Sequence, residues 1–347
     1  MFFITGYTLL CIIVIIYLGS ILILYLRRNP INYSSGGSEK STVTHIHLGT
    51  QGDMGNQLFQ LACIISAGKR SNANIILPSR IARLPIIQLF DLTQFEWKDT
   101  NIDTSYHEYD NFEHILIPHD GRIYNINGYR QSYLYFEDNA SIIRDIFVPK
   151  PDILNTMKSI LPTKYIALHI RKGDYMKFIH KIPLLREFRI CQLSYYKCAI
   201  KELRKDHPDC PLLVCTDSPN WVTSILSELD SNAIIAPTVG SISPKFSDFC
   251  TLYLADAMIM SNSTYSFWAG YLRNNRIIIA PSPWWDPDGF IGTAIGLDSY
   301  HLHHPEWLLL DSDTGKQIRE PNSTYGDRHD SDSETLNIYR LIRGLLL

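Results

Sequence analysis

The stretch Tyr165 to Asp174, which reads YIALHIRKGD, decides the fold that we expect, because an apolar run ends there in a cluster of charge. In an open α/β sheet, ligands bind outside the carboxyl ends of the strands. A guanidinium group at such an end can grip the oxygens of a phosphate or a carboxylate with two parallel hydrogen bonds. Arg171 is therefore the first candidate for a functional residue. The alternative is a solvated loop whose surface ion pairs are worth little energy.

Downstream of this stretch, apolar runs of strand length alternate with segments of helical period. The expected strands are residues 211–216, 233–236, 257–260 and 276–280, and the expected helices are residues 191–206, 221–229, 246–255 and 264–273. Such a regular alternation predicts a parallel, doubly wound sheet.

Upstream of the stretch, the globular part opens with a strand over residues 42–48, a glycine-containing loop and a helix. Residues 74–77 read as the next strand. Residues 91–120 are rich in acidic and aromatic side chains and read as loops that could line an acceptor cleft. A further helix is expected over residues 138–147, with Asp or Asn at its start as the cap.

The prolines between residues 149 and 162 punctuate the chain around a short helix, so we place a domain boundary near Thr163. A chain of 347 residues is long enough for about two domains that each bury a core. We therefore expect an N-terminal domain over residues 42–163, a C-terminal domain over residues 164–320 and a tail over residues 321–347.

The overall composition argues against some classes of function. A net charge of −3 and a pI near 6.4 come without a basic stripe, so no nucleic-acid partner is expected and an anionic substrate must be gripped locally. The seven cysteines show no spacing typical of a metal site, which argues against structural zinc. One or two disulfides would fit a secretory lumen, although Cys63 and Cys215 lie in apolar segments typical of buried thiols.

The first segment of the chain, residues 1–26, contains no charged side chain and is rich in Ile and Leu. It is long enough to cross a bilayer, and we predict one transmembrane helix there. A cleaved signal peptide is the alternative, but the run is too long and lacks a clear cleavage site. Residues 27–41 are polar, with Gly, Ser and Pro, and are typical of a flexible stem.

Two opposing signals bear on the orientation of that helix. Arg27 and Arg28 follow it, and the positive-inside rule would then leave the large domain in the cytosol. Asn-x-Ser/Thr sequons, in contrast, matter only in a lumen. They occur at Asn32, Asn139, Asn262 and Asn322. In a lumenal domain we expect the first, second and fourth to be glycosylation sites, whereas Asn262 lies at the expected donor site.

A loop over residues 49–57, GTQGDMGNQ, joins the first expected strand to its helix. Glycines in such a loop let the backbone approach a ligand and leave helix N–H groups free for an anion. A tight turn without a ligand is the alternative. The candidate residues in this loop are Gly52, Gly55, Asn56 and Gln57.

A second helix N-terminus, over residues 261–266 (SNSTYS), carries hydroxyl and amide side chains. Such a terminus either caps itself or holds a phosphate, because its N–H groups have no partner within the helix and its dipole end is positive. The candidate residues here are Asn262, Ser263, Thr264 and Ser266. Asp217, which follows the strand over residues 211–216, is either a ligand-binding carboxylate or part of a helix cap.

Six motifs in order give the chain a resemblance to a known family. They are GDMGNQLFQ (52–60), GYRQS (128–132), HIRKGD (169–174), LSYY (193–196), TDS (216–218) and SNSTYSFWAG (261–270). Together they resemble the motif set of the α-1,2-fucosyltransferases, glycosyltransferase family eleven, over about residues 43–286. Lys172 departs from the family pattern, which usually has two adjacent arginines, because a lysine supplies charge but no bidentate fork.

The resemblance implies two Rossmann-like domains in a GT-B-type arrangement, with GDP-β-L-fucose as the donor and a terminal galactose as the acceptor. It also implies a Golgi membrane anchor of type II and a lumenal catalytic domain, against the charges of Arg27 and Arg28. No metal or other cofactor is expected. Residues 188–191, together with Phe267 and Tyr271, also depart from the family pattern, which leaves the acceptor more open than the reaction.

The residue types support a mechanism in which the acceptor hydroxyl attacks the anomeric carbon of fucose and inverts it. We expect Arg171, helped by Lys172 and the helix N-terminus at residues 263–264, to neutralise the leaving diphosphate. Asn56 is expected to orient the β-phosphate or the acceptor hydroxyl, as a similar Gly-Asn-Gln motif of the protein O-fucosyltransferases suggests.

Two further roles are assigned to carboxylates. Asp217 and Asp248 are candidates for contacts with the ribose and the guanine. As the general base we prefer Asp174 to His169. An unperturbed histidine titrates near neutrality, but one that ends a buried strand is more often structural.

Two other classes of protein stay open. A metal-dependent glycosyltransferase would hold a divalent ion with an Asp-x-Asp pair, and this string occurs at residues 286–288, 311–313 and 330–332. A non-catalytic, membrane-anchored sugar-binding protein is the third reading. It would keep the fold but would need no diphosphate clamp, so Arg171 beside a helix N-terminus argues against it.

Overall fold

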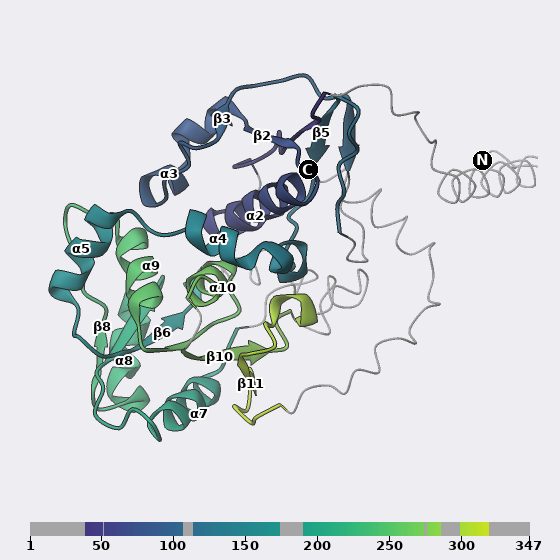
Figure 1. The fold of residues 1–347 in the computed structure, drawn as a ribbon. Helices are drawn as coiled ribbons and strands as arrows, with labels where there is room; N and C mark the ends of the chain where they lie inside the picture. The colour runs from purple at the N-terminus through teal and green to yellow at the C-terminus, as the bar shows by residue number, and fades with distance from the viewer. Residues whose placement is uncertain are drawn as a thin grey trace, which may run out of the picture.

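The computed structural model describes residues 39–50, 52–106, 114–173, 190–273, 276–285 and 299–318. This part of the chain forms two sheets of parallel strands flanked by helices, which confirms the α/β class (Figure 1). The predicted transmembrane helix, most of the predicted stem and the predicted tail lie outside the described residues. Within the described residues, no helix combines the length and the apolar character that crossing a membrane requires.

The N-terminal sheet has five strands in the order β3-β2-β1-β5-β4, all parallel. Its strands are β1 (Thr42–Thr44), β2 (Asn74–Leu77), β3 (Glu96–Trp97), β4 (Thr104–Tyr106) and β5 (Ile123–Ile126). Residues 91–120, expected as loops and short elements, thus contribute two edge strands in their described part. Between the strands lie α2 (Met54–Arg70), a 3-10 turn η1 (Ser79–Arg83) and α3 (Ile86–Leu89).

The first strand ends at Thr44, so the expectation of a strand over residues 42–48 is wrong at its carboxyl end. The chain leaves the sheet after Thr44 because the polar groups of the next two residues hydrogen-bond to partners outside the strand pairing. The N–H of Ile46 donates to Oδ1 of Asn125 (2.9 Å), and Nε2 of His45 pairs with the carbonyl oxygen of Gly128 (3.0 Å). The partners are about 80 residues away along the chain, so local periodicity could not reveal them.

The C-terminal sheet has six parallel strands in the order β11-β10-β9-β6-β7-β8. Its strands are β6 (Ile166–Ile170), β7 (Leu212–Thr216), β8 (Ala233–Ile235), β9 (Ala257–Ile259), β10 (Ile277–Ser282) and β11 (Leu308–Asp311). The strands expected from alternation are confirmed, with small shifts at their ends. β6 is buried along its whole length and lies between β7 and β9. The carboxyl ends of these three strands therefore meet at one edge of the sheet.

The helices of this half are α7 (Leu193–Leu203), α8 (Pro219–Leu229), α9 (Pro244–Leu254) and α10 (Thr264–Tyr271), followed later by the 3-10 turn η5 (Ser299–Leu302). α9 begins two residues before its expected start, whereas α8 begins with Ser218 as the N-cap and Pro219 in the first helical position, as the sequence predicts. Each begins at a proline, whose fixed φ suits the first position of a helix and whose missing N–H is no loss there. α7 is shorter at both ends than expected.

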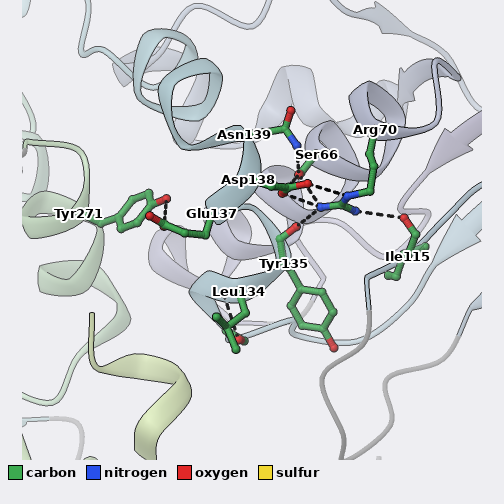
Figure 2. A network of polar contacts seen from close by, with 10 residues as sticks. Ser66, Arg70, Ile115, Leu134, Tyr135, Glu137, Asp138, Asn139 and Tyr271 are labelled. Carbon is green, nitrogen blue, oxygen red and sulfur yellow. Dashed lines mark hydrogen bonds and ion pairs between the residues drawn. The ribbon is translucent and has the colours of Figure 1, made fainter. Parts of the chain in front are cut away.

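The helix expected over residues 138–147 is split into a 3-10 turn η3 (Glu137–Asn139) and α4 (Ala140–Ile146). Asn139 is the N-cap residue of α4, as expected, but it makes no side-chain cap hydrogen bond. Its side chain and that of Asp138 are used elsewhere (Figure 2). Asp138 accepts two hydrogen bonds of 2.7 Å from the guanidinium of Arg70, and Nδ2 of Asn139 donates to Oγ of Ser66 (2.8 Å). This network ties the end of α2 to the segment 135–139. A glycan at Asn139 stays a prediction and would have to fit beside Ser66.

The chain between the two sheets carries η2 (Tyr133–Tyr135) and α5 (Pro151–Ile160). The boundary that we placed near Thr163 falls after α5 and directly before β6. α5 nevertheless packs against α9 of the C-terminal half (Figure 1). Residues before the expected boundary thus already pack against the C-terminal half.

α2 is the central element of the structure and lies between the N-terminal sheet and α10 (Figure 1). Fourteen of its seventeen residues are buried, so it is apolar around most of its circumference. Phe59 shows the consequence, since its ring lies 4.7 Å from that of Phe267 and 5.1 Å from that of Trp268 on α10. One continuous apolar core includes residues from both sheets.

None of the six cysteines in the described residues forms a disulfide. The disulfides that would fit a secretory lumen therefore do not occur among these six. Cys63 and Cys215 are buried, as predicted.

We predict that Phe59→Ala lowers the free energy of unfolding by about 3 to 5 kcal/mol, as for large truncations in other cores. Because the ring bridges the two halves, both should lose stability together. Urea unfolding followed by circular dichroism and by tryptophan fluorescence should give one coincident transition, shifted to lower urea. Two separate transitions, with only one shifted, would show that each half has its own core.

Candidate functional site

The candidate site lies at the carboxyl edge of the C-terminal sheet, where the segments after β6, β7 and β9 meet. Arg171 follows β6, and its Nε lies 3.2 Å from Oδ2 of Asp217, which follows β7. Oδ1 of Asp217 accepts hydrogen bonds of 3.0 Å from the backbone N–H groups of Lys172 and Gly173. The carboxylate thus holds both the guanidinium and the turn that carries it.

The charge of Asp217 is maintained by these contacts. Burial alone would raise the pKa of its carboxyl, but the two backbone N–H groups and the Arg171 guanidinium hold the pKa below its ordinary value. Asp217 was expected to bind the ribose or guanine or to cap a helix. In this structure it anchors Arg171, and it also accepts a hydrogen bond from Oγ of Ser218 (3.1 Å).

Lys172 points away from Arg171 toward α8. Its Nζ lies 3.6 Å from the centre of the Trp221 ring, a cation–π contact. Partial burial lowers the pKa of this ammonium. We expected Lys172 to help Arg171 neutralise the diphosphate. The contact with Trp221 does not favour that role.

His169, the last but one residue of β6, is buried, and its Nδ1 lies 2.8 Å from Oγ of Ser261. Burial, together with the charge of Arg171, lowers the pKa of its imidazole to about 3. The ring is therefore neutral at physiological pH and too weak a base to take a proton from a hydroxyl. Asp174, the preferred base, lies outside the described residues.

The N-termini of α2 and α10 lie directly against each other. A Cβ atom built at Gly55 would lie 2.5 Å from Oγ1 of Thr264 and 2.6 Å from the backbone N of Tyr265. Only glycine fits at this position. Two helix ends with positive dipole thus meet here. At the α2 end, the N–H groups of Met54 and Asn56 already donate to Asp53, whose pKa the charge of Arg171 helps to lower.

Asn56 joins these two helix ends through its side chain. Its Oδ1 accepts a hydrogen bond from Nε2 of Gln131 (2.7 Å) and another from Oγ1 of Thr264 (3.1 Å). The loop before α2 has the backbone that its glycines predict, since Gly52 has a φ of +70°, where glycine is favoured. Gln57, also a candidate, is buried within α2.

A second polar contact joins the halves at the same place. Asp53 caps α2 by accepting a hydrogen bond from the N–H of Met54 (2.7 Å), and its other oxygen pairs with Nζ of Lys245 from α9. The hydroxyl of Tyr265 donates to the backbone oxygen of Lys245. The loop before α2 is therefore held by both α9 and α10.

The polar residues before α10 divide into two groups. Asn262 is buried and faces inward, with Nδ2 donating to the backbone oxygen of Trp284 (3.2 Å), so its side chain lies in the core rather than at a ligand surface. Oγ of Ser266 donates to the backbone oxygens of Ser261 and Ser263 (3.0 Å each), which ties the first turn of α10 to the segment before it. Ser263 is the N-cap residue of α10 and makes no side-chain cap bond.

Asp248 lies on α9 beside the carboxyl end of β7. Burial raises the pKa of its carboxyl to about 7, although the group accepts a hydrogen bond from the backbone N–H of Thr216. With this pKa the carboxyl is partly protonated near neutral pH, and its neutral form can donate a hydrogen bond as well as accept one. This property suits a contact with a polar ligand edge, which is the role that we expected for it.

In the described part of the chain, no group of three or more His, Cys, Asp or Glu side chains could hold a metal ion. In the Asp-x-Asp string at residues 311–313, Oδ1 of Asp311 accepts from the N–H and the hydroxyl of Thr314 (2.7 Å each), so this carboxylate caps a turn. The other two strings lie outside the described residues, as do Asn32 and Asn322.

Comparison with known proteins decides the family. The family model described as Glycosyl transferase family 11 matches residues 51–307, which is most of the chain. The chain belongs to glycosyltransferase family 11. This family 11 enzyme is therefore a glycosyltransferase, and the matched range includes Asn56, Arg171 and every strand of the two sheets except β1 and β11.

Relatives of this family 11 enzyme are distant. It is 26% identical over 164 residues to an alpha-1,2-colitosyltransferase of Escherichia coli, a match that covers 46% of this chain and 55% of that protein. It is 18% identical over 289 residues to galactoside alpha-(1,2)-fucosyltransferase 2 of Oryctolagus cuniculus, covering 78% of each chain. A galactoside alpha-(1,2)-fucosyltransferase 1 of Alouatta belzebul is 22% identical, over 76% of this chain and 74% of that protein.

Solved structures show a more general likeness. A crystal structure of POFUT1 in complex with GDP has a TM-score of 0.45 at 11% identity, covering 70% of this chain and 96% of that one. Fucosyltransferase NodZ from Bradyrhizobium has a TM-score of 0.41 at 13% identity, covering 67% and 93%. The family assignment therefore rests on the sequence match.

Sequence reasoning missed three residues of this site. Asp53 and Lys245 form an ion pair between segments 192 residues apart, and neither was singled out. Gln131 lies in the GYRQS motif, which was recognised without a role for any of its residues. The motif itself was the available signal. Its glutamine belongs to no helical or strand pattern, which suggests a role other than packing within such an element.

We predict that Asp248→Asn is stabilising above neutral pH. The pKa of this carboxyl is 3.8 in an ordinary environment and about 7 in the fold, so between these values the unfolded chain releases a proton that the folded chain retains. Stability contributed by the neutral carboxyl is therefore lost as the pH rises through this window. Urea unfolding should show a gain of about 1 to 3 kcal/mol for the variant at pH 8 and little at pH 4. The exposed Asp206→Asn serves as the control, and equal gains at both pH values would contradict the prediction.

Proposed function

We propose that this glycosyltransferase transfers L-fucose from GDP-β-L-fucose to O2 of a terminal galactose, with inversion at the anomeric carbon. The observation that carries the proposal is that the N-termini of α2 and α10 touch at Gly55, with Arg171 near enough for its charge to lower the pKa of Asp53 at the α2 cap. A leaving diphosphate needs several positive groups and N–H donors at once, and this arrangement supplies them without a metal. The names of the distant relatives support an α-1,2 linkage and a galactoside acceptor.

The leaving group is the centre of the proposed mechanism. As the bond between fucose and the β-phosphate breaks, negative charge accumulates on the diphosphate. Arg171 is already held by Asp217 at 3.2 Å, so its guanidinium need not be reorganised when that charge appears. The first turns of α2 and α10 add backbone donors and positive dipole ends. A preorganised set of this kind lowers the barrier more than mobile surface charges would.

Other roles follow from the side-chain positions. Asn56, between the two helix ends, would orient the β-phosphate or the acceptor hydroxyl. Asp248 would contact the ribose or the guanine from α9. The general base would be Asp174, because His169 is buried and neutral. We assign His169 the task of supporting Ser261, and through it the turn before α10.

For the donor sugar, one of the relatives suggests an alternative to fucose. The relative with 26% identity is named for transfer of colitose, not fucose, with the same α-1,2 linkage. Sugar nucleotides that share the nucleotide but differ in the sugar would use the same diphosphate clamp. Assaying GDP-fucose and GDP-colitose side by side, with product linkage determined by NMR, separates the two.

We further propose that the chain is a single-pass type II Golgi membrane protein with its catalytic part in the lumen. The support is the uncharged apolar segment of residues 1–26, followed by sequons that a lumenal enzyme could use. Arg27 and Arg28 oppose this orientation under the positive-inside rule.

We predict that Arg171→Lys lowers kcat by about 100-fold or more, on the scale of removing one preorganised donor. A lysine keeps the charge but loses the planar fork that pairs with Asp217 and a phosphate together. Arg171→Ala should be worse. Lys172→Ala should reduce kcat far less, because Nζ of Lys172 lies on the Trp221 ring. Steady-state rates with GDP-fucose and a β-galactoside give the comparison, and circular dichroism must stay native. A folded Arg171→Lys within about threefold of wild type, under roughly 1 kcal/mol of barrier, would refute the clamp.

We predict that excess EDTA leaves most of the transferase activity in place. The proposed clamp consists of a guanidinium and backbone N–H groups, none of which a chelator removes. The same fucose transfer assay, run with and without EDTA, provides the measurement. Loss of activity that Mn²⁺ restores would instead favour a metal-dependent glycosyltransferase.

A further inference from the structure

The side-chain amide of Asn56 is held by two donors from opposite halves of the molecule. Gln131 belongs to the N-terminal half and Thr264 begins α10 in the C-terminal half, and both direct a hydrogen to Oδ1 of Asn56. An amide oxygen with two lone pairs is saturated by two such donors. The orientation of the amide is therefore set by its oxygen.

The other end of the same amide faces the loop before α2. A Cβ atom at Gly52 would lie only 2.0 Å from Nδ2 of Asn56, so this nitrogen occupies the space that the missing side chain leaves. Nδ2 makes no hydrogen bond to another residue among those that the structure describes. Its two N–H donors thus face the exposed Gly52 in the loop before α2, and the charge of Arg171 reaches Asp53 of the same loop.

The segment that carries Gln131 is held in an unusual backbone conformation. Arg130, directly before it, has a φ of +54°, which is costly for a residue with a side chain. The side chain of Arg130 is buried, with Nε donating to the backbone oxygen of Asn127 (2.6 Å) and Nη2 to that of Tyr106 (3.1 Å). Strain of this kind persists only where surrounding contacts enforce it, and it concentrates at functional sites.

We propose that Gln131 is a positioning residue, which acts through Asn56 by fixing the amide with its N–H groups toward the substrates. This proposal rests on the proposed function, since it names the residue that fixes the orientation of Asn56, one of the groups proposed to bind the substrates. Without the donor from Gln131, the amide of Asn56 could turn by about 180°, because its two ends are similar in shape. Its oxygen would then compete with the acceptor hydroxyl for a proton.

Gln131→Glu is the most informative variant, because glutamate has the shape of glutamine but its carboxylate cannot donate. It should lower kcat about 10- to 100-fold, the scale of misplacing one group in a reactive geometry. Gln131→Ala should fall in the same range, and the KM for the donor should change by less than about threefold. If Gln131 only filled space, the glutamate variant would work like the wild type. Gln94→Ala, an exposed glutamine elsewhere, is the matched control.

A double-variant cycle tests whether the effect runs through Asn56. The combined Gln131→Ala and Asn56→Ala variant should be no slower than Asn56→Ala alone, because the group to be oriented is already gone. Multiplied losses would overturn the proposal, as would a Gln131→Glu variant with wild-type kcat. Thermal shifts with GDP should be unchanged in all variants that keep Asn56, which shows that the nucleotide site is intact.

The cycle uses whichever donor the wild-type enzyme accepts from a panel of GDP-linked and UDP-linked sugars, including GDP-fucose. Use of another sugar nucleotide would refute the proposed donor and still leave the role of Gln131 measurable. Should the wild type accept none, the glycosyl-transfer proposal fails, and the Gln131 proposal fails with it. Failure of Gln131 alone appears as an active wild type with an equally active Gln131→Glu variant.

Discussion

The site depends on one close approach, the contact between the first turns of α2 and α10 at Gly55. Because a Cβ atom would lie 2.5 Å from Thr264 there, the two helix ends come closer than side chains would allow. Each end carries a partial positive charge of about half a unit, so their approach is electrostatically unfavourable by itself. The Asp53 carboxylate relieves part of this repulsion at the cap of α2. An anion bound between the two ends would relieve the rest, which is a physical reason for a diphosphate site at this place.

The shared core makes that contact persistent. Phe59 on α2 and Trp268 on α10 pack in one apolar cluster that also includes residues of both sheets. A rigid pairing of the helices fixes the distance between Asn56 and Thr264, and hence the hydrogen bonds to the amide. A second apolar cluster packs on the C-terminal sheet alone, so the two halves share one core while the C-terminal half also has a core of its own.

Sequence reasoning predicted the backbone of the site better than its side chains. The apolar run of β6, the charge that follows it and the hydroxyl-rich start of α10 are local features, and the structure confirms their placement. The directions of Lys172 and Asn262 are set instead by Trp221 and Trp284, partners 49 and 22 residues further along the chain. Gln131 meets Asn56 across 75 residues. Such pairings depend on how the two sheets pack together, and neither spacing nor periodicity encodes that packing.

The burial of α2 also has a consequence for biosynthesis. Asn56 and Thr264 are 208 residues apart, so α2 leaves the ribosome long before the helix that covers its apolar face exists. At roughly 5 to 20 residues per second, the interval is on the order of 10 to 40 seconds. During this time the face of α2 that packs against α10 in the finished fold has no such partner within its own chain.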